Sequence, residues 1–141
     1  MLVNGPNLNT LGQREPEIYG KTTLQEIEQT IQKLVESAGH QFEAIQSNSE
    51  SELVGWIQDR RGYDFLLINA AAFTHTSVAL RDAISFSDVP FIEIHISNVY
   101  KRESFRHHSY LSDIAIGVIA GMGAKGYELA TFFALDYLNS R

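Results

Sequence analysis

The chain has 141 residues, a length that predicts one domain, residues 1–141, with a single hydrophobic core. Its 11 basic and 17 acidic residues leave a net charge of −6, which argues against a surface for nucleic acid or anionic lipid, and it has no cysteine for disulfides or thiolate metal sites. The longest stretch without charged or strongly polar residues, Ile114 to Ala124, is too short to span a bilayer, and the start shows no signal peptide. We therefore expect a soluble, cytoplasmic protein.

The hydrophobic pattern alternates between strand and helix along the whole chain. Thr22-Thr23 followed by Glu26 predicts a helix that begins with a capping box, and Gly39 ends this helix. Ser49 with Glu52 predicts a second capping box. In chain order we expect a strand at 1–3, a helix at 23–38, a strand at 40–46, a helix from 49 that carries Ile57, a strand at 65–68, a helix at 77–87, strands at 91–96 and 114–119, and a helix at 125–139.

This alternation predicts the fold class. Strands and helices that alternate in one small domain form a parallel sheet with helices on both faces, because the crossovers are right-handed. The interpretation is an α/β, flavodoxin-like, five-stranded parallel sheet. Ligands of such sheets bind beyond the carboxyl ends of the strands. Here those ends carry Asn4 to Asn7, Asn69 and His95 to Asn98, more polar groups than plain turns require.

Three familiar motifs are considered and set aside. Gly121 to Gly126 matches the GxGxxG pattern of dinucleotide-binding loops, but it follows the last strand, so we interpret its glycines as turn and packing residues. The chain lacks GxSxG, the nucleophile motif of serine hydrolases. The histidines show no i, i+4 pair around a glutamate, which argues against a zinc site: His40, His75, His95, His107 and His108.

Two polar segments favour a small anionic ligand. Lys101 to His108 holds three of the 11 basic residues of an otherwise acidic chain; the alternative is an exposed charged loop. Gly12 to Gly20, which carries Arg14 and Tyr19, is predicted to be a mobile lid. An isolated tyrosine or strand histidine is usually structural, but these segments and His95 converge on the same strand ends.

Five segments are recognisable together: Asn4 to Asn9, Arg14 to Gly20, Thr74 to Asp82, Glu93 to Val99 and Phe105 to Tyr110. In order through nearly the whole chain, they resemble the type II 3-dehydroquinate dehydratase family. The resemblance implies a hydro-lyase that converts 3-dehydroquinate to 3-dehydroshikimate by anti elimination through an enolate. This reaction is a step of the shikimate pathway, which leads to chorismate and aromatic amino acids, and also of quinate breakdown. It implies no metal and no organic cofactor. It also implies a homo-oligomer, a dodecamer built from trimers.

The resemblance assigns catalytic roles to five residues. Tyr19 corresponds to the base that abstracts the proton, and Arg14 to the arginine that keeps it ionised. His95 corresponds to the general acid that protonates the departing hydroxyl, with Glu93 as its orienting partner. Asn7 corresponds to the residue that stabilises the enolate through a bound water. A phenol that acts as a base near neutral pH needs a nearby cation, which Arg14, with Arg102 from the basic segment, can supply.

The resemblance also implies the substrate contacts. The carboxylate is held by Asn69 and the backbone amides of Ile96 and Ser97, the ring hydroxyls by His75 and Arg106, and a further contact comes from Asp82 of a neighbouring subunit. One departure follows Asn69, where Ala70-Ala71 stand in place of the family's proline and small residue. We expect a less rigid loop with a modest effect on substrate affinity.

The alternative interpretation is a flavodoxin-like module that binds a small anion or flavin without catalysis. A phosphoacceptor receiver needs clustered acids where this chain has Asn4, Asn7 and Asn69. A flavin carrier needs a Ser/Thr-rich phosphate loop, and Gly5 to Gly12 has only Thr10. A Schiff-base route to the same product needs a buried lysine, whereas the four lysines fall in predicted loops or helices.

Overall fold

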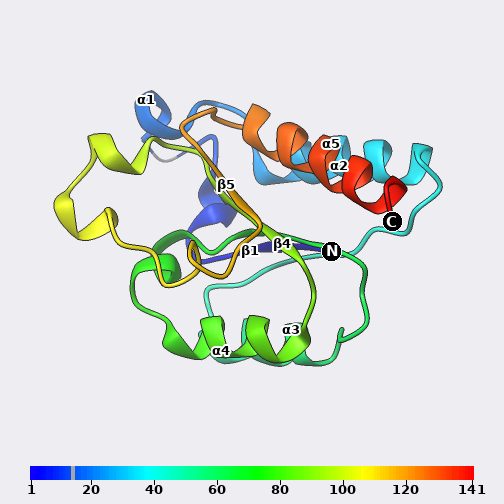
Figure 1. Ribbon diagram of the computed structural model, residues 1–141. Coiled ribbons are helices and arrows are strands. Elements are labelled where there is room, and N and C mark those ends of the chain that lie inside the picture. Colours follow the sequence, from blue (N-terminus) through cyan, green and yellow to red (C-terminus); the bar gives the residue numbers. More distant parts are fainter. Residues whose placement is uncertain (14) are drawn as a thin grey trace.

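A five-stranded parallel sheet with the order β2-β1-β3-β4-β5 forms the centre of the computed structural model, which describes residues 1–13 and 15–141 (Figure 1). The strands are β1 (Leu2–Asn4), β2 (Ala44–Gln46), β3 (Leu66–Asn69), β4 (Phe91–His95) and β5 (Gly117–Ala120). The helices are α1 (Pro16–Tyr19), α2 (Leu24–Ser37), α3 (Glu50–Gln58), α4 (Val78–Ser87) and α5 (Lys125–Asn139). Within this described part, no helix combines the length and the apolar character needed to cross a membrane.

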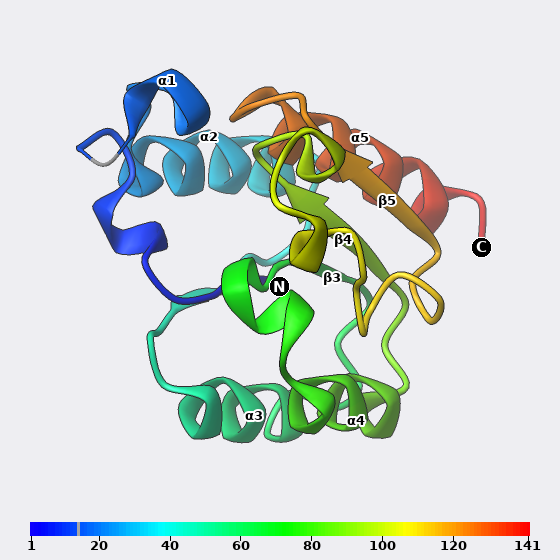
Figure 2. The same cartoon turned by 90° about the vertical axis from the view of Figure 1, so that its left-hand side faces the viewer.

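Helices cover both faces of the sheet, which confirms the predicted α/β, flavodoxin-like architecture. Helices α2 and α5 lie on one face and α3 and α4 on the other (Figures 1 and 2). Successive strand residues therefore enter different cores: Leu67 packs with the α2 and α5 side, whereas Leu66 and Ile68 pack with the α3 and α4 side. Burial on both faces explains why the strands are almost continuously apolar.

The strand order creates a switch point at the carboxyl ends of β1 and β3. The chain moves from β1 outward to β2 and then returns to the other side of β1 to form β3. The connections after β1 and β3 thus leave in opposite directions, and a crevice opens between them. Asn4 and Asn69, the last residues of these two strands, are paired in register at this point.

The two predicted capping boxes differ in the structure. At α2, Glu26 N–H donates to Thr23 Oγ1 at 3.2 Å and Thr23 N–H donates to the Glu26 carboxylate at 3.3 Å, as predicted. At α3, Glu52 N–H donates to Ser49 Oγ at 3.3 Å, but the Glu52 carboxylate accepts from Ser47 Oγ at 2.7 Å. The second capping box is half formed, because the Glu52 carboxylate accepts a hydrogen bond from the Ser47 hydroxyl instead of from the Ser49 N–H.

The predicted bounds of two strands are wrong. Strand β2 begins at Ala44 instead of His40, because its partner β1 pairs through only three residues. Strand β5 begins at Gly117 instead of Ile114, because the N–H groups of Ile114 and Ala115 turn back to the Leu111 carbonyl at 3.1 Å. Ile114 and Ala115 then pack beside the α3 and α4 core.

The segment predicted as a lid is not a plain loop. Helix α1 occupies Pro16–Tyr19 within it, with Pro16 at the first helical position, where its missing N–H costs nothing. Tyr19 ends this helix and is half-buried. The helix carries Tyr19 on a short regular element beside the carboxyl ends of the strands.

Candidate active site

A pocket lies beyond the carboxyl ends of β1, β3 and β4. Eight of the predicted residues line it: Asn7, Tyr19, Asn69, His75, His95, Ile96, Ser97 and Arg106. Leu8, Leu11 and Val99 supply an apolar part of the wall. The fold thus brings side chains as far apart in the sequence as Asn7 and Arg106 into one concave site.

His95 and Glu93 form a buried pair at the end of β4. They are two positions apart, so their side chains leave the same face of the strand, and His95 Nε2 lies 2.6 Å from Glu93 Oε1. Glu93 is completely buried and His95 is 7% exposed. A carboxylate on Nε2 holds the proton on that nitrogen and leaves Nδ1 for another partner. This arrangement can orient an imidazole for proton transfer.

Two serines complete the surroundings of Glu93. Ser109 Oγ donates to Glu93 Oε1 at 2.7 Å, and Ser112 Oγ donates to Oε2. Burial opposes the charge on Glu93, but the hydrogen bonds from His95, Ser112 and Ser109 outweigh it and hold the pKa of Glu93 below its ordinary value. Glu93 is therefore ionised at neutral pH and places a negative charge behind His95.

Tyr19 meets the predicted basic segment. Arg102 Nη1 donates a 2.6 Å hydrogen bond to the Tyr19 phenol oxygen, and the guanidinium carbon lies 5.3 Å from the centre of the phenol ring. A guanidinium stays charged at all relevant pH values, so this hydrogen bond is charge-assisted. The contact suits a phenol that accepts a proton from carbon.

His75 lies beside His95, with the two rings stacked 6.3 Å apart at 17°. Its Nδ1 is 2.8 Å from the His108 carbonyl oxygen, so Nδ1 carries the proton and donates. Burial, with the nearby charges of His95 and Arg106, lowers the pKa of His75. A neutral His75 with Nδ1 protonated has an acceptor at Nε2, which suits a ligand hydroxyl.

Asn7 and Asn69 are held by their local backbone. Asn7 has φ 69°, in the left-handed region, and its N–H donates to Asn48 Oδ1 at 2.9 Å. Asn69 Oδ1 accepts from Ala71 N–H at 3.1 Å, which closes the turn formed by Ala70-Ala71. Ala71 itself has φ 52°, a conformation that costs a non-glycine residue energy.

The predicted glycine motif supports the end of β4. Gly121 N–H donates to the His95 carbonyl at 3.2 Å, and Gly123 N–H donates to the Ile96 carbonyl at 3.0 Å. Gly121 has φ 86°, and an added Cβ there would come within 3.1 Å of Asn98. This geometry agrees with the interpretation of the motif as a tight turn, and it holds the backbone that carries the Ile96 and Ser97 amides.

Three predicted residues are not among the described lining residues. One is Glu93, which is buried and contacts the pocket residue His95. Asp82 is exposed on α4, away from this pocket of its own chain. Arg14 lies outside the described residues. Among residues 1–13 and 15–141, no group of three or more His, Asp or Glu residues is arranged to hold a metal ion.

Three contributors are absent from the predicted catalytic and substrate-binding set. Arg102 appears in the sequence analysis only as a helper of Arg14, although it contacts Tyr19 directly. Ser109 lies in one of the five recognised segments, which was a usable signal, whereas Ser112 has only its spacing from Ser109. Their partners lie 16 or more positions away, so local pattern could not assign the contacts.

Comparisons with known sequences agree on one family. The sequence profile described as Dehydroquinase class II matches residues 1–135. A 3-dehydroquinate dehydratase of Cellvibrio japonicus is 57% identical over 142 residues, which cover 99% of this chain and 96% of the relative. A 3-dehydroquinate dehydratase of Haemophilus influenzae is 58% identical over 139 residues, which cover 98% of this chain and 93% of the relative.

Solved structures lead to the same family. The type II dehydroquinase of Propionibacterium acnes superposes with a TM-score of 0.87 at 43% identity and covers 99% of this chain and 94% of its own. That of Butyrivibrio crossotus gives a TM-score of 0.88 at 42% identity, with 98% and 94% covered. These relatives give no support to a non-catalytic binding module. The chain belongs to the class II dehydroquinase family.

Proposed function

We propose that the pocket dehydrates 3-dehydroquinate to 3-dehydroshikimate by anti elimination through an enolate, a hydro-lyase step of the shikimate pathway. The observation that carries the proposal is the presence of two proton-transfer groups in one pocket. These groups are Tyr19 with its Arg102 contact and His95 with its Glu93 contact. The family supplies the substrate and the reaction.

The two groups divide the elimination between them. Tyr19, as the phenolate, removes a proton from the carbon beside the ketone, and the electron pair of that C–H bond forms the enolate. Asn7 stabilises the enolate oxygen through a bound water. His95, as the imidazolium, then protonates the departing hydroxyl, which leaves as water while the ring double bond forms. We assign Glu93 the task of holding His95 in place, and no step uses a metal or organic cofactor.

The remaining lining residues are proposed to bind the substrate. Asn69 and the amides of Ile96 and Ser97 hold its carboxylate, while His75 and Arg106 hold ring hydroxyls. Arg106 donates to Glu103 at 2.6 Å in this structure, which keeps its guanidinium beside the pocket. We further propose that Arg14 joins Arg102 at the phenol oxygen. For an enzyme of this biosynthetic pathway, the cytoplasm is the proposed location.

The reaction is tested by an ultraviolet assay of the purified protein with 3-dehydroquinate, in chelator and without added cofactor. The conjugated enone of the product absorbs where the substrate does not, so we expect a steady rise in absorbance. Sodium borohydride added with substrate will leave the activity intact, because the route uses no Schiff base. A folded protein that produces no rise would contradict the proposal.

We also propose that the site is completed by a neighbouring subunit, within a dodecamer built from trimers. The exposed position of Asp82 on α4, away from its own pocket, supports this. Asp82→Ala and Tyr19→Phe will each be poorly active alone. Oligomers that mix the two variants will regain activity, because a Tyr19 from one subunit can meet an Asp82 from the other. Light scattering gives the mass, and mixed oligomers without recovery would contradict the shared site.

A further inference from the structure

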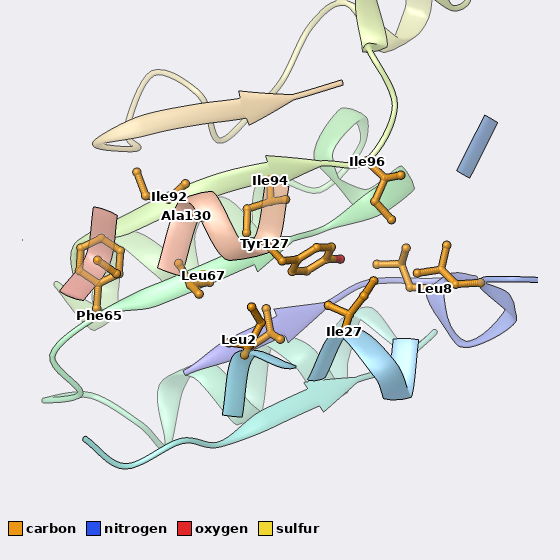
Figure 3. Packing of buried hydrophobic residues seen from close by; sticks show 13 residues of the cluster. Leu2, Leu8, Ile27, Phe65, Leu67, Ile92, Ile94, Ile96, Tyr127 and Ala130 are labelled. Atoms are coloured by element: carbon orange, nitrogen blue, oxygen red, sulfur yellow. The ribbon is translucent and has the colours of Figure 1, made fainter. Parts of the chain in front are cut away.

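Tyr127 is a buried residue of α5 whose hydroxyl links two strand ends. The side chain is completely buried among apolar residues, and Figure 3 shows its hydroxyl directed toward the carboxyl ends of the strands. The hydroxyl donates to Asn4 Oδ1 at 2.8 Å and accepts from Asn69 Nδ2 at 2.9 Å. Burying a phenol oxygen without hydrogen-bond partners is costly, and these two hydrogen bonds satisfy the buried hydroxyl. Burial raises the pKa of Tyr127, and the hydroxyl keeps its proton.

The direction of these hydrogen bonds is determined by proton count. Ala71 N–H can only donate, so the Asn69 atom that accepts from it is Oδ1. Nδ2 of Asn69 therefore faces the Tyr127 oxygen and donates to it. Tyr127 has a single proton, which must then go to Asn4 Oδ1. A flipped Asn69 amide would set Nδ2 against the Ala71 N–H, two donors facing each other.

This orientation decides what Asn69 offers to a ligand. Nδ2 carries two protons, and Tyr127 uses one of them. The other is left for a ligand in the pocket that Asn69 lines. We propose that Tyr127 is a positioning residue, whose hydroxyl holds the Asn69 carboxamide so that an N–H is presented to the substrate's oxygens. The inference rests on the proposed function, in which Asn69 binds the substrate carboxylate.

The first test removes only the hydroxyl. Tyr127→Phe keeps the ring but leaves one of the two contacts that orient Asn69, so KM for 3-dehydroquinate will rise by about 3- to 10-fold, the effect of one hydrogen bond. Because the contact is made equally in the ground and transition states, kcat will stay within about twofold. An unchanged KM, or a fall confined to kcat, would overturn the proposal.

The second test approaches Tyr127 from the side away from the pocket. Asn4 does not belong to the described lining residues, and it contacts Tyr127. Asn4→Leu, which has the same branched shape but no polar atoms, removes the acceptor of the Tyr127 proton. The Tyr127 hydroxyl can then turn its proton toward Asn69 and compete with the hydrogen bond that Asn69 donates. KM will rise here as well, and the double variant with Tyr127→Phe will be no worse than the poorer single variant. If the effects of the two substitutions on KM were fully additive, Asn4 would not act on Asn69 through Tyr127, and the proposal would be contradicted.

A neighbouring hydroxyl provides the control for mere structural damage. Thr131 is also buried on α5, one turn beyond Tyr127, and donates to the Tyr127 carbonyl at 2.8 Å. Thr131→Val will lower the melting temperature but leave KM unchanged, because it does not touch Asn69. If Tyr127→Phe behaves in the same way, Tyr127 is structural only and the inference fails.

A readout without substrate separates this inference from the reaction itself. In the wild type, one Nδ2 proton of Asn69, assigned by its loss in Asn69→Asp, will exchange slowly with water in nuclear magnetic resonance spectra. In Tyr127→Phe it will exchange rapidly. An inactive wild type with this slow proton would contradict the proposed function but support the positioning by Tyr127. Rapid exchange in the wild type would overturn the positioning whatever the activity.

Discussion

Replacing Tyr19 by phenylalanine will lower kcat for 3-dehydroquinate by about 10²- to 10⁴-fold, the usual contribution of a general base. In the proposed reaction the phenol oxygen accepts the proton, and Arg102 already donates to this oxygen at 2.6 Å. The side chain is only half-buried, so the melting temperature will change little. The absorbance assay and a thermal melt measure the two effects.

The control for Tyr19 is another tyrosine of the same region. Tyr100 is 69% exposed and does not belong to the described pocket lining, so Tyr100→Phe will keep full turnover. Arg102→Met, which keeps the stem without the charge, will lower turnover, because it removes one of the two cations proposed at the phenol oxygen. Arg14→Ala will also lose most of its turnover. Near-normal turnover of Tyr19→Phe would remove Tyr19 as the base.

Replacing His95 by alanine will reduce kcat by about 10²- to 10⁴-fold while KM changes much less, since in the proposed mechanism His95 acts on the departing hydroxyl in the transition state. His95 is the member of the buried pair that lines the pocket. His107, which is exposed and outside the described lining, provides the control, and His107→Ala will keep its turnover. A change confined to KM would contradict the acid role.

Glu93→Gln tests the contribution of the carboxylate that contacts His95. It removes the charge that Ser109 and Ser112 help to hold, so kcat will fall, but less than in His95→Ala. Because folding lowers the pKa of Glu93, its carboxylate stabilises the protein above the ordinary pKa of about 4.3, and this contribution is lost as the pH falls through the lowered value. The melting temperature of Glu93→Gln will therefore approach that of the wild type in acid. A constant gap between the two would contradict the assignment.

The fold was largely predictable because it depends on local patterns. The apolar stretch at Phe65 to Ile68 predicts a strand buried on both faces, and β3 occupies Leu66–Asn69. Thr23 and Glu26 start α2 as their spacing predicts. Strand bounds were less predictable, because the length of β2 is set by its three-residue partner β1.

For the candidate site, the identities of many residues were predictable from the sequence, but their contacts were not. The residue types and their order were sufficient to name the family and half of the lining residues, from Asn7 to Arg106. The contacts that orient these side chains join distant parts of the chain: Arg102 and Tyr19 are 83 positions apart, and Asn69 and Tyr127 are 58 apart. Periodicity, caps and motifs are properties of neighbouring residues, so they predict elements and candidates. Which donor meets which acceptor depends on the strand order and the packing of α5 on the sheet, which arise only when the whole chain is folded.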